Sequence, residues 1–264
     1  MEHWRAERES WDRLAAEMPD LLSAASTQYY RRREIALFQR YVGPLAGKRL
    51  LKLDLWNEAF NTRILNWASG QGANAFGLDA SEYISRRAWQ NARAAGDSLH
   101  VVQADIRRLP FADESFDLVY SMGTIEHIAE YREALAEVRR VLRVGGRAII
   151  GVPHTWNVFL RPLLVVVLTW LGKYPYAPER SFGGGELRRL VEGCGLRVLA
   201  RTGILTIPGA VRMADLFLHR AGSRLQRLTA LLVRPFEALK SRFAWSGRFG
   251  YLVVMVAEKP ERRS

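Results

Sequence analysis

Short apolar segments alternate with longer segments of helical periodicity through the middle of this 264-residue chain, from residue 49 to residue 153. The apolar segments have the length of strands, and the segments between them repeat apolar residues at the spacing of an amphipathic helix. This alternation predicts a doubly wound α/β fold, in which helices cover both faces of a parallel sheet. Ligands of such sheets bind beyond the carboxyl ends of the strands, so the residues that follow each strand are the candidate site.

The pattern also predicts where the elements begin and end. Ser81 is the expected N-cap of one helix, and Gly145-Gly146 is the expected end of another. The expected strands are 49–55, 73–78, 100–103, 116–121, 147–152, 196–201 and 251–258, and the expected helices of the core are 57–68, 81–95, 131–142 and 186–192. We divide the chain into an N-terminal helical cap (1–44), an α/β core (45–211) with an apolar insertion (154–180), a basic amphipathic helical insertion (212–248), and a last strand and tail (249–264).

Basic residues outnumber acidic ones, 39 to 27, which gives a net charge of +12 and favours an anionic membrane surface or a nucleic acid as partner. Residues 212–248 alone hold eight basic and two acidic side chains, half of the excess. Their leucines recur at helical spacing, which is typical of a helix at a bilayer surface; a helical layer with solvated arginines is the equal alternative. Nucleic acid is the less favoured partner, because the basic residues alternate with aliphatic rather than aromatic side chains.

The remaining composition narrows the class of protein. The single cysteine, Cys194, excludes an intramolecular disulfide and a cysteine-rich zinc site, and we expect no metal. The apolar segment 158–171 is shorter than the ~20 residues that cross a bilayer. The polar first ten residues contain no secretory signal, so we expect a cytoplasmic protein, peripheral on the inner membrane face if the basic helix binds lipid.

Acidic residues end two successive strands: Asp79 in GLDAS and Asp105 in VVQADIRRLPF. A carboxylate at the end of the second strand of such a sheet can hold a ribose diol, and one at the end of the third can accept from an adenine amino group. Two further motifs follow, FADESFDLVYSMGTIEHI at 111–128 and AEVRRVLRVGGRAIIGVP at 136–153.

This succession resembles the class I S-adenosylmethionine-dependent methyltransferases, in the small-molecule and lipid branch that includes the ubiquinone and menaquinone C-methyltransferases. The resemblance covers roughly residues 45–153 and returns more weakly at 181–204 and 251–258. It implies a Rossmann-like fold with S-adenosylmethionine as cofactor. By this resemblance the cofactor lies against Asp79 and Ala80 at the ribose, Asp105 and Ile106 at the adenine, and Ser121 and Met122 near the methionine moiety.

The first strand departs from the family pattern, in which it leads into a turn of the type D-x-G-x-G-x-G. Here the chain reads LLKLDLWNEAF at 50–60, with Lys52 at the acidic position and Asp54, Trp56 and Glu58 at the glycine positions. Glycines there let the backbone approach the ligand. Either the loop is remodelled, and Asp54, Asn57 or Glu58 contacts the positive charge of the cofactor, or cofactor binding is lost.

The fourth strand is followed by SMGTIEH, without the D/N-P-P-Y/F signature of methylation on base amines and glutamine amides. Methyl transfer to oxygen or carbon of an apolar or amphiphilic small molecule is therefore the favoured activity. His127 and His154 are the candidate catalytic bases, because histidine titrates near working pH, although either can simply pack in the core. Two alternatives stay open: a non-catalytic, membrane-associated binding protein and an RNA methyltransferase.

Overall fold

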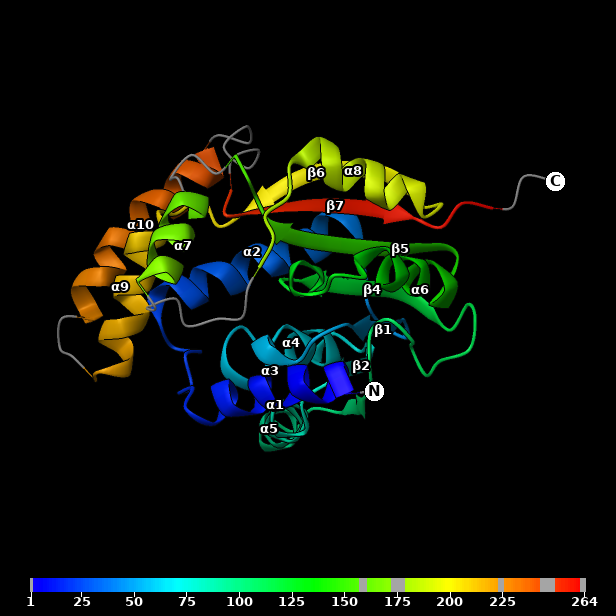
Figure 1. Ribbon diagram of the computed structural model, residues 1–264, viewed down its shortest axis with the longest axis horizontal. Helices are drawn as coiled ribbons and strands as arrows, with labels where there is room; N and C mark the ends of the chain where they lie inside the picture. The colour runs from blue at the N-terminus through cyan, green and yellow to red at the C-terminus, as the bar shows by residue number, and fades with distance from the viewer. Residues whose placement is uncertain (1, 157–160, 172–178, 223–225, 243–249, 262–264) are drawn as a thin grey trace.

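A seven-stranded sheet with the order β3-β2-β1-β4-β5-β7-β6 forms the centre of the molecule (Figure 1). The computed structural model describes residues 2–156, 161–171, 179–222, 226–242 and 250–261. The strands are β1 (Arg49–Lys52), β2 (Asn74–Asp79), β3 (Leu99–Gln103), β4 (Phe116–Met122), β5 (Leu142–Pro153), β6 (Arg197–Ile204) and β7 (Leu252–Glu258). The first five strands are mutually parallel, and β7 pairs antiparallel with both β5 and β6.

Helices cover both faces of this sheet, as the apolar periodicity predicts. One apolar core packs α2 (Ala25–Tyr41), α4 (Ile64–Gly70) and α5 (Glu82–Ala94) against the sheet, and the other packs α6 (Tyr131–Val141) and α8 (Gly184–Gly193). The remaining helices are α1 (Glu2–Ala16), α3 (Trp56–Phe60), the short 3-10 turn η1 (Ile125–His127), α7 (Arg161–Trp170), α9 (Gly209–Arg220) and α10 (Gln226–Arg242). The expected doubly wound, Rossmann-like sheet is thus confirmed, with β7 as its one reversed strand among the described elements.

The structure confirms one predicted helix boundary, the start of α5, and corrects two other local predictions. Ser81 caps α5 as predicted, because its hydroxyl accepts a hydrogen bond from the Ile84 N–H at 3.0 Å. Gly145-Gly146 do not end α6 as predicted: α6 ends at Val141, and Leu142 already pairs with Phe116 of β4 as the start of β5. The predicted helix 57–68 is broken into α3 and α4, and Arg63 adopts a left-handed conformation (φ 48°) at the break.

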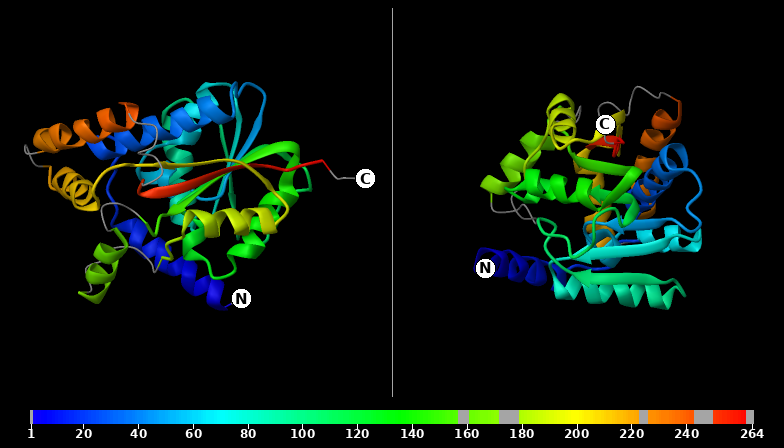
Figure 2. Two further views of the ribbon diagram at one scale, coloured as in Figure 1. Left: turned by 90° about the horizontal axis from the view of Figure 1, so that it is seen from above. Right: turned by 90° about the vertical axis from the view of Figure 1, so that its right-hand side faces the viewer.

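Helices α7, α9 and α10 lie at the same end of the molecule, the end at the carboxyl edge of the parallel strands (Figure 1). Figure 2, seen from above, separates α7 from α9 and α10, which pack on one another and on α2. The buried Asp215 of α9 joins these helices: its carboxylate accepts from the Ser26 N–H at 2.7 Å and from the Thr229 hydroxyl at 2.6 Å. Within the predicted insertions, residues 157–160, 172–178, 223–225 and 243–249 lie outside the described residues.

The same three helices expose large apolar side chains to solvent. Phe217 is 70% exposed and Trp170 is 84% exposed, so neither side chain packs into the core. The exposed set is Leu163, Val166, Val167, Trp170 and Leu171 at α7, Met213 and Phe217 on α9, and Leu228, Leu231 and Leu232 on α10. We call these ten residues the apolar face. None of the helices in the described part of the chain is both long and apolar enough to cross a bilayer.

Candidate functional site

A cavity of about 570 Å³ opens beyond the carboxyl ends of β1, β2, β3 and β4, where the topology predicts a ligand site. Eight of the residues predicted from the sequence line it: Asp54, Asn57, Asp79, Ala80, Asp105, Ile106, Met122 and His127. The other three, Glu58, Ser121 and His154, do not contribute to its wall. The folded chain thus brings most of the predicted cofactor residues to one place.

Asp79 ends β2 at the floor of this cavity. Its two carboxylate oxygens accept from the backbone N–H groups of Leu55 and Ser81, both at 2.9 Å, which fixes the orientation of the side chain. Burial raises the pKa of Asp79 to about 6, against the lowering effect of these two hydrogen bonds. Each oxygen retains a lone pair, so the carboxylate can accept two more hydrogen bonds, as a ribose diol requires.

Where the family has a glycine-rich turn after the first strand, this chain forms the short helix α3, which begins a few residues after β1. Lys52 is fully buried beneath it, and its ammonium group donates to the backbone oxygen of Asp54 at 2.7 Å and to Oδ1 of the same residue at 2.9 Å. The Thr124 hydroxyl donates to Asp54 Oδ2 at 2.8 Å. The Asp54 carboxylate is thereby held in the cavity wall by one side chain from β1 and one from the loop after β4.

Glu58, which the sequence offered as a ligand for the cofactor charge, points into the protein instead. Its carboxylate accepts from the Leu65 N–H at 3.1 Å and lies 3.9 Å from the Lys52 ammonium group. Burial raises the pKa of Glu58 to about 7. A second buried carboxyl, Glu34 of α2, accepts from the Tyr120 hydroxyl at 2.6 Å, and burial raises its pKa to about 7 as well. The helical path of the loop turns Glu58 toward this buried cluster.

Sequence reasoning missed Asn61, which follows α3 and lines the cavity. Its side chain is 6% exposed and donates to Asn57 Oδ1 at 3.0 Å, while its own Oδ1 has no partner among the described residues. An unpartnered buried acceptor is costly unless a ligand completes it. The spacing of four between Asn57 and Asn61 was the available signal, because it places both side chains on one helix face.

Asp105 reaches the cavity with its charge already compensated. The Arg107 guanidinium donates to both of its carboxylate oxygens and also contacts Glu130 at 3.0 Å. Ile106 and Met122 add apolar wall beside it. Ser121 is fully buried on the opposite side of β4 from Met122, because successive side chains of a strand point to opposite faces.

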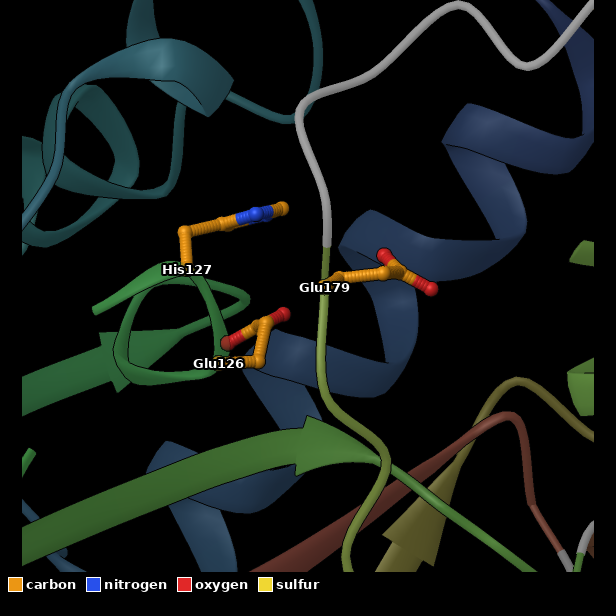
Figure 3. A group of neighbouring side chains, drawn as sticks. All are labelled: Glu126, His127 and Glu179. Atoms are coloured by element: carbon orange, nitrogen blue, oxygen red, sulfur yellow. The ribbon is translucent and has the colours of Figure 1, made fainter. Parts of the chain in front are cut away.

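The other half of the cavity mixes apolar and ionisable side chains. Leucines and methionines from β7, α9 and the segment after β6 form one wall, and Tyr30 and Arg212 lie among them. Glu126 and His127 of η1 lie close to Glu179 at this end, with their ligand atoms within 4.8 Å of one another (Figure 3). Trp11 of α1 packs its ring against His127 at 5.2 Å and against Trp56 at 5.8 Å, so the N-terminal helix forms part of the roof.

His154 lies outside this group. It is 2% exposed, and its backbone N–H donates to the Tyr251 oxygen at 3.1 Å. Burial lowers the pKa of its imidazole, and the nearby Arg201 lowers it further. The antiparallel pairing of β7 beside the end of β5 covers this residue, so the structure places an enclosed imidazole of lowered pKa where the sequence offered a catalytic base.

The strand order and the reversed last strand are those of class I methyltransferases, which are Rossmann-like folds. The sequence agrees: residues 57–150 match the family described as "Methyltransferase domain". Over these residues the chain is similar to the class I S-adenosylmethionine-dependent methyltransferases that act on small molecules, a family whose cofactor is S-adenosylmethionine.

Two curated relatives and one solved structure show which proteins this chain is similar to. It is 34% identical over 134 residues to a demethylmenaquinone methyltransferase of Clavibacter sepedonicus, a match that spans 49% of either chain. It is 26% identical over 168 residues to a ubiquinone biosynthesis O-methyltransferase of Rhizobium rhizogenes, spanning 62% of this chain and 66% of the relative. The chain therefore spans about half to two thirds of these relatives. An S-adenosylmethionine-dependent methyltransferase from Mesorhizobium loti shares the fold, with a TM-score of 0.58 at 18% identity over 85% of this chain and 97% of that one.

Proposed function

We propose that this protein transfers a methyl group from S-adenosylmethionine to oxygen or carbon of an apolar or amphiphilic small molecule, at a membrane surface. The observation that carries the proposal is the cavity of about 570 Å³, which runs without interruption from Asp79 at the end of β2 to the apolar wall contributed by α9 and β7. Such a cavity accommodates a nucleoside cofactor at one end and an acceptor molecule at the other. The quinone-biosynthesis relatives favour an acceptor of the same amphiphilic class.

The residues of the remodelled loop fit the cofactor. S-adenosylmethionine carries a ribose diol, an ammonium group and a sulfonium, so its site needs hydrogen-bond acceptors and negative charge. Asp79 supplies acceptors at the ribose end, and Asp54 and Asn61 supply a carboxylate and an unpartnered amide oxygen in the neighbouring wall. Side-chain oxygens would thus take over the part that backbone groups of a glycine turn play in the family.

The acceptor end of the cavity would position a nucleophile toward the methyl group. The cofactor, when bound, supplies an electrophilic methyl whose carbon–sulfur bond breaks with the electron pair left on sulfur. An acceptor hydroxyl loses its proton in this reaction, and the His127 imidazole, which lines the cavity, is placed to receive it. Apolar walls from Leu205 and Leu216 exclude water and orient the acceptor, and positioning of this kind supplies much of the rate.

Calorimetric titration with S-adenosylmethionine and S-adenosylhomocysteine tests the proposal directly. We expect binding that Asp79→Ala abolishes or weakens by ~10-fold or more, since hydrogen bonds to a charged group are worth about 1.5–3 kcal/mol. Asp113→Ala is the matched control, because that carboxylate is 73% exposed and away from the cavity wall. Folded protein that binds neither ligand would contradict the proposal and favour the alternative of a non-catalytic binding protein, which the glycine-free first loop suggests.

The membrane part of the proposal is supported by the apolar face together with the basic charge of the chain. Apolar side chains on α7, α9 and α10 remain exposed at the end of the molecule where the cavity lies, and Met213 belongs both to that face and to the cavity wall. A basic, apolar surface favours an anionic bilayer, from which an amphiphilic acceptor can pass into the cavity.

Liposome co-sedimentation tests this part separately. We expect binding to vesicles that contain anionic phospholipid and none to neutral vesicles. Leu228→Asp should abolish the binding, because it puts a charge at a residue that is 55% exposed on the apolar face. Val144→Asp, an exposed apolar residue at the start of β5, should leave binding unchanged. Equal binding by both variants would sink the membrane proposal without affecting methyl transfer.

A further inference from the structure

An arginine of α9 lies in the cavity wall without a charged partner. Arg212 lines the cavity together with Leu216 of the same helix and Tyr30 of α2. Its Nη1 atom is buried and has no hydrogen-bond partner, and its guanidinium forms no ion pair among the described residues. We propose that Arg212 and Tyr30 form a subsite that binds an oxyanion of the acceptor molecule, either a carboxylate or a phosphate group.

The packing of α9 on α2 fixes the place of the guanidinium. The Asp215 carboxylate accepts from the Ser26 N–H at 2.7 Å and from the Thr229 hydroxyl at 2.6 Å, which joins α9 to α2 and α10. Tyr30 lies about one helical turn after Ser26 on α2, and Arg212 lies about one turn before Asp215 on α9. The same contact therefore brings the two residues together, with the Arg212 guanidinium over the Tyr30 ring, 5.4 Å from its centroid.

Acidic groups that could have compensated this charge have other partners. Asp215, three residues further along α9, has both carboxylate oxygens engaged by α2 and α10. Asp54, in the same cavity wall, is held by the buried lysine of β1 at 2.9 Å. Arg107, which also lines the cavity, donates to both carboxylate oxygens of Asp105 at 2.9 Å, so its charge is already paired. Arg212 thus remains the guanidinium of the described wall that an anionic ligand would complete, because a partly buried charge is costly without a partner.

The hydrogen-bond donors of the subsite indicate which chemical group it binds. A guanidinium presents a planar fork of N–H groups, which matches two oxygens of a carboxylate or a phosphate. The Tyr30 hydroxyl supplies a further donor: burial and the nearby Glu34 raise the pKa of Tyr30 well above its ordinary value, against the lowering effect of Arg212, so the hydroxyl keeps its proton. Leu205 and Leu216 line the same cavity and suit the apolar body of the ligand.

This subsite deepens the proposed function, on which its role in substrate selection rests. It narrows the acceptor from any apolar or amphiphilic molecule to one that carries an anionic oxygen group on an apolar body. The oxyanion held at Arg212 is a recognition group, and the oxygen or carbon that takes the methyl group is a separate atom of the acceptor. An uncharged molecule of the same shape would leave the guanidinium without a partner, so it should bind more weakly.

Calorimetric titration of the full chain with amphiphiles that share a decyl tail, in the absence of cofactor, tests the subsite. The probes are decanoate, decyl phosphate and the uncharged decanol. We expect at least one of the two anions to bind ~10-fold or more tightly than decanol, because charge-assisted hydrogen bonds are stronger than neutral ones. Whichever anion binds more tightly identifies the oxyanion that the subsite prefers.

Variants of the two residues then locate the binding. Arg212→Gln should weaken binding of that anion by ~10-fold or more and leave decanol binding unchanged, since only the charge-assisted contacts are lost. Arg212→Lys should restore part of the affinity, because it keeps the charge but not the planar fork. Tyr30→Phe keeps the ring beneath the guanidinium and should weaken anion binding by ~3-fold or more. Arg220→Gln is the matched control, because Arg220 is an exposed arginine of the same helix outside the cavity wall. Far-ultraviolet circular dichroism of each variant shows that it remains folded.

The outcomes separate this subsite from the proposed methyl transfer. Equal binding of the anions and decanol, or anion binding that Arg212→Gln leaves unchanged, would overturn the subsite, and methyl transfer stands if the same protein binds S-adenosylhomocysteine. A loss of S-adenosylhomocysteine affinity in Arg212→Gln that matches the loss of anion affinity would assign the arginine to the carboxylate of the cofactor and also overturn the subsite. Anion binding that depends on Arg212, in protein that binds neither S-adenosylmethionine nor S-adenosylhomocysteine, would uphold the oxyanion site and contradict the methyltransferase proposal instead.

Discussion

Replacing Lys52 with methionine removes the cation from a buried group of acids. The Lys52 ammonium contacts Asp54 at 2.9 Å and Glu58 at 3.9 Å, and its attraction lowers the pKa of Glu34 as well. Methionine fills the space of the lysine stem but leaves these carboxyls without a compensating charge. Breaking a buried ion pair in this way costs about 3–5 kcal/mol of the free energy of unfolding.

The loss of unfolding free energy caused by Lys52→Met should depend on pH. The pKa values of the neighbouring glutamates determine that the loss grows as pH rises. Glu34 and Glu58 both have pKa values of about 7 because of burial, so both are largely ionised at pH 8 and largely protonated at pH 5.5. Because Lys52 lowers both pKa values, the two glutamates of Lys52→Met must at pH 8 either stay charged without compensation or take up protons, whereas at pH 5.5 they are already largely protonated. We expect the full loss at pH 8 and a distinctly smaller one at pH 5.5, where proton uptake neutralises the two glutamates.

Urea unfolding followed by tryptophan fluorescence at the two pH values measures the effect. Lys48→Met is the matched control: Lys48 donates one hydrogen bond to the Val42 carbonyl at 3.0 Å, and its loss should cost about 0.5–1.5 kcal/mol at both pH values. Adding Glu58→Gln to Lys52→Met should recover part of the stability at pH 8. A loss from Lys52→Met that matches the control, or one that is equal at the two pH values, would refute this account of the buried cluster.

Three further outcomes follow from the same geometry. Glu34→Gln should stabilise the protein by on the order of 1–3 kcal/mol at pH 8 and little at pH 4.5, measured by urea unfolding, because the raised pKa of Glu34 costs stability as pH rises toward about 7. Binding of S-adenosylhomocysteine should weaken below pH 6, where Asp79 takes up a proton, and Asp79→Asn should bind more weakly at every pH without that dependence. Asn61→Leu should weaken calorimetric binding of S-adenosylhomocysteine but not of methylthioadenosine, which lacks the amino-acid moiety; an equal effect on both ligands would argue against contact with the ammonium group.

The pattern of apolar residues was sufficient to predict the sheet. In each strand and helix of the core, the spacing of apolar residues over a short segment already distinguishes a strand from a helix. Asp79 and Asp105 were identified as site residues on the same ground, since a residue that follows a strand must lie at the carboxyl edge of a parallel sheet. The direction of β7 was not predictable in this way. Pairing direction depends on the path of the connection from α10, and an apolar run reads the same in both directions.

In the first loop, the local sequence pattern does not predict which side chains face the cavity. In the sequence, Glu58 occupies a glycine position and is as good a candidate ligand as Asp54. The short helix α3 turns Glu58 inward to Lys52 and leaves Asp54 and Asn61 in the cavity wall. Which face of a five-residue helix is buried depends on what packs against it, here α5 from a later part of the chain and the buried Lys52 of β1.

Sequence by itself thus determined the architecture, the edge of the sheet where the cavity opens and eight of the residues that line the cavity. Only the tertiary structure decided that His154 is enclosed, that Lys52 balances a buried group of acids, and that Glu179 lies beside Glu126 and His127. The physical reason is the range of the interactions. Strand and helix periods arise between neighbours in the chain, whereas the partners of a side chain arise from segments that meet only when the loops have packed.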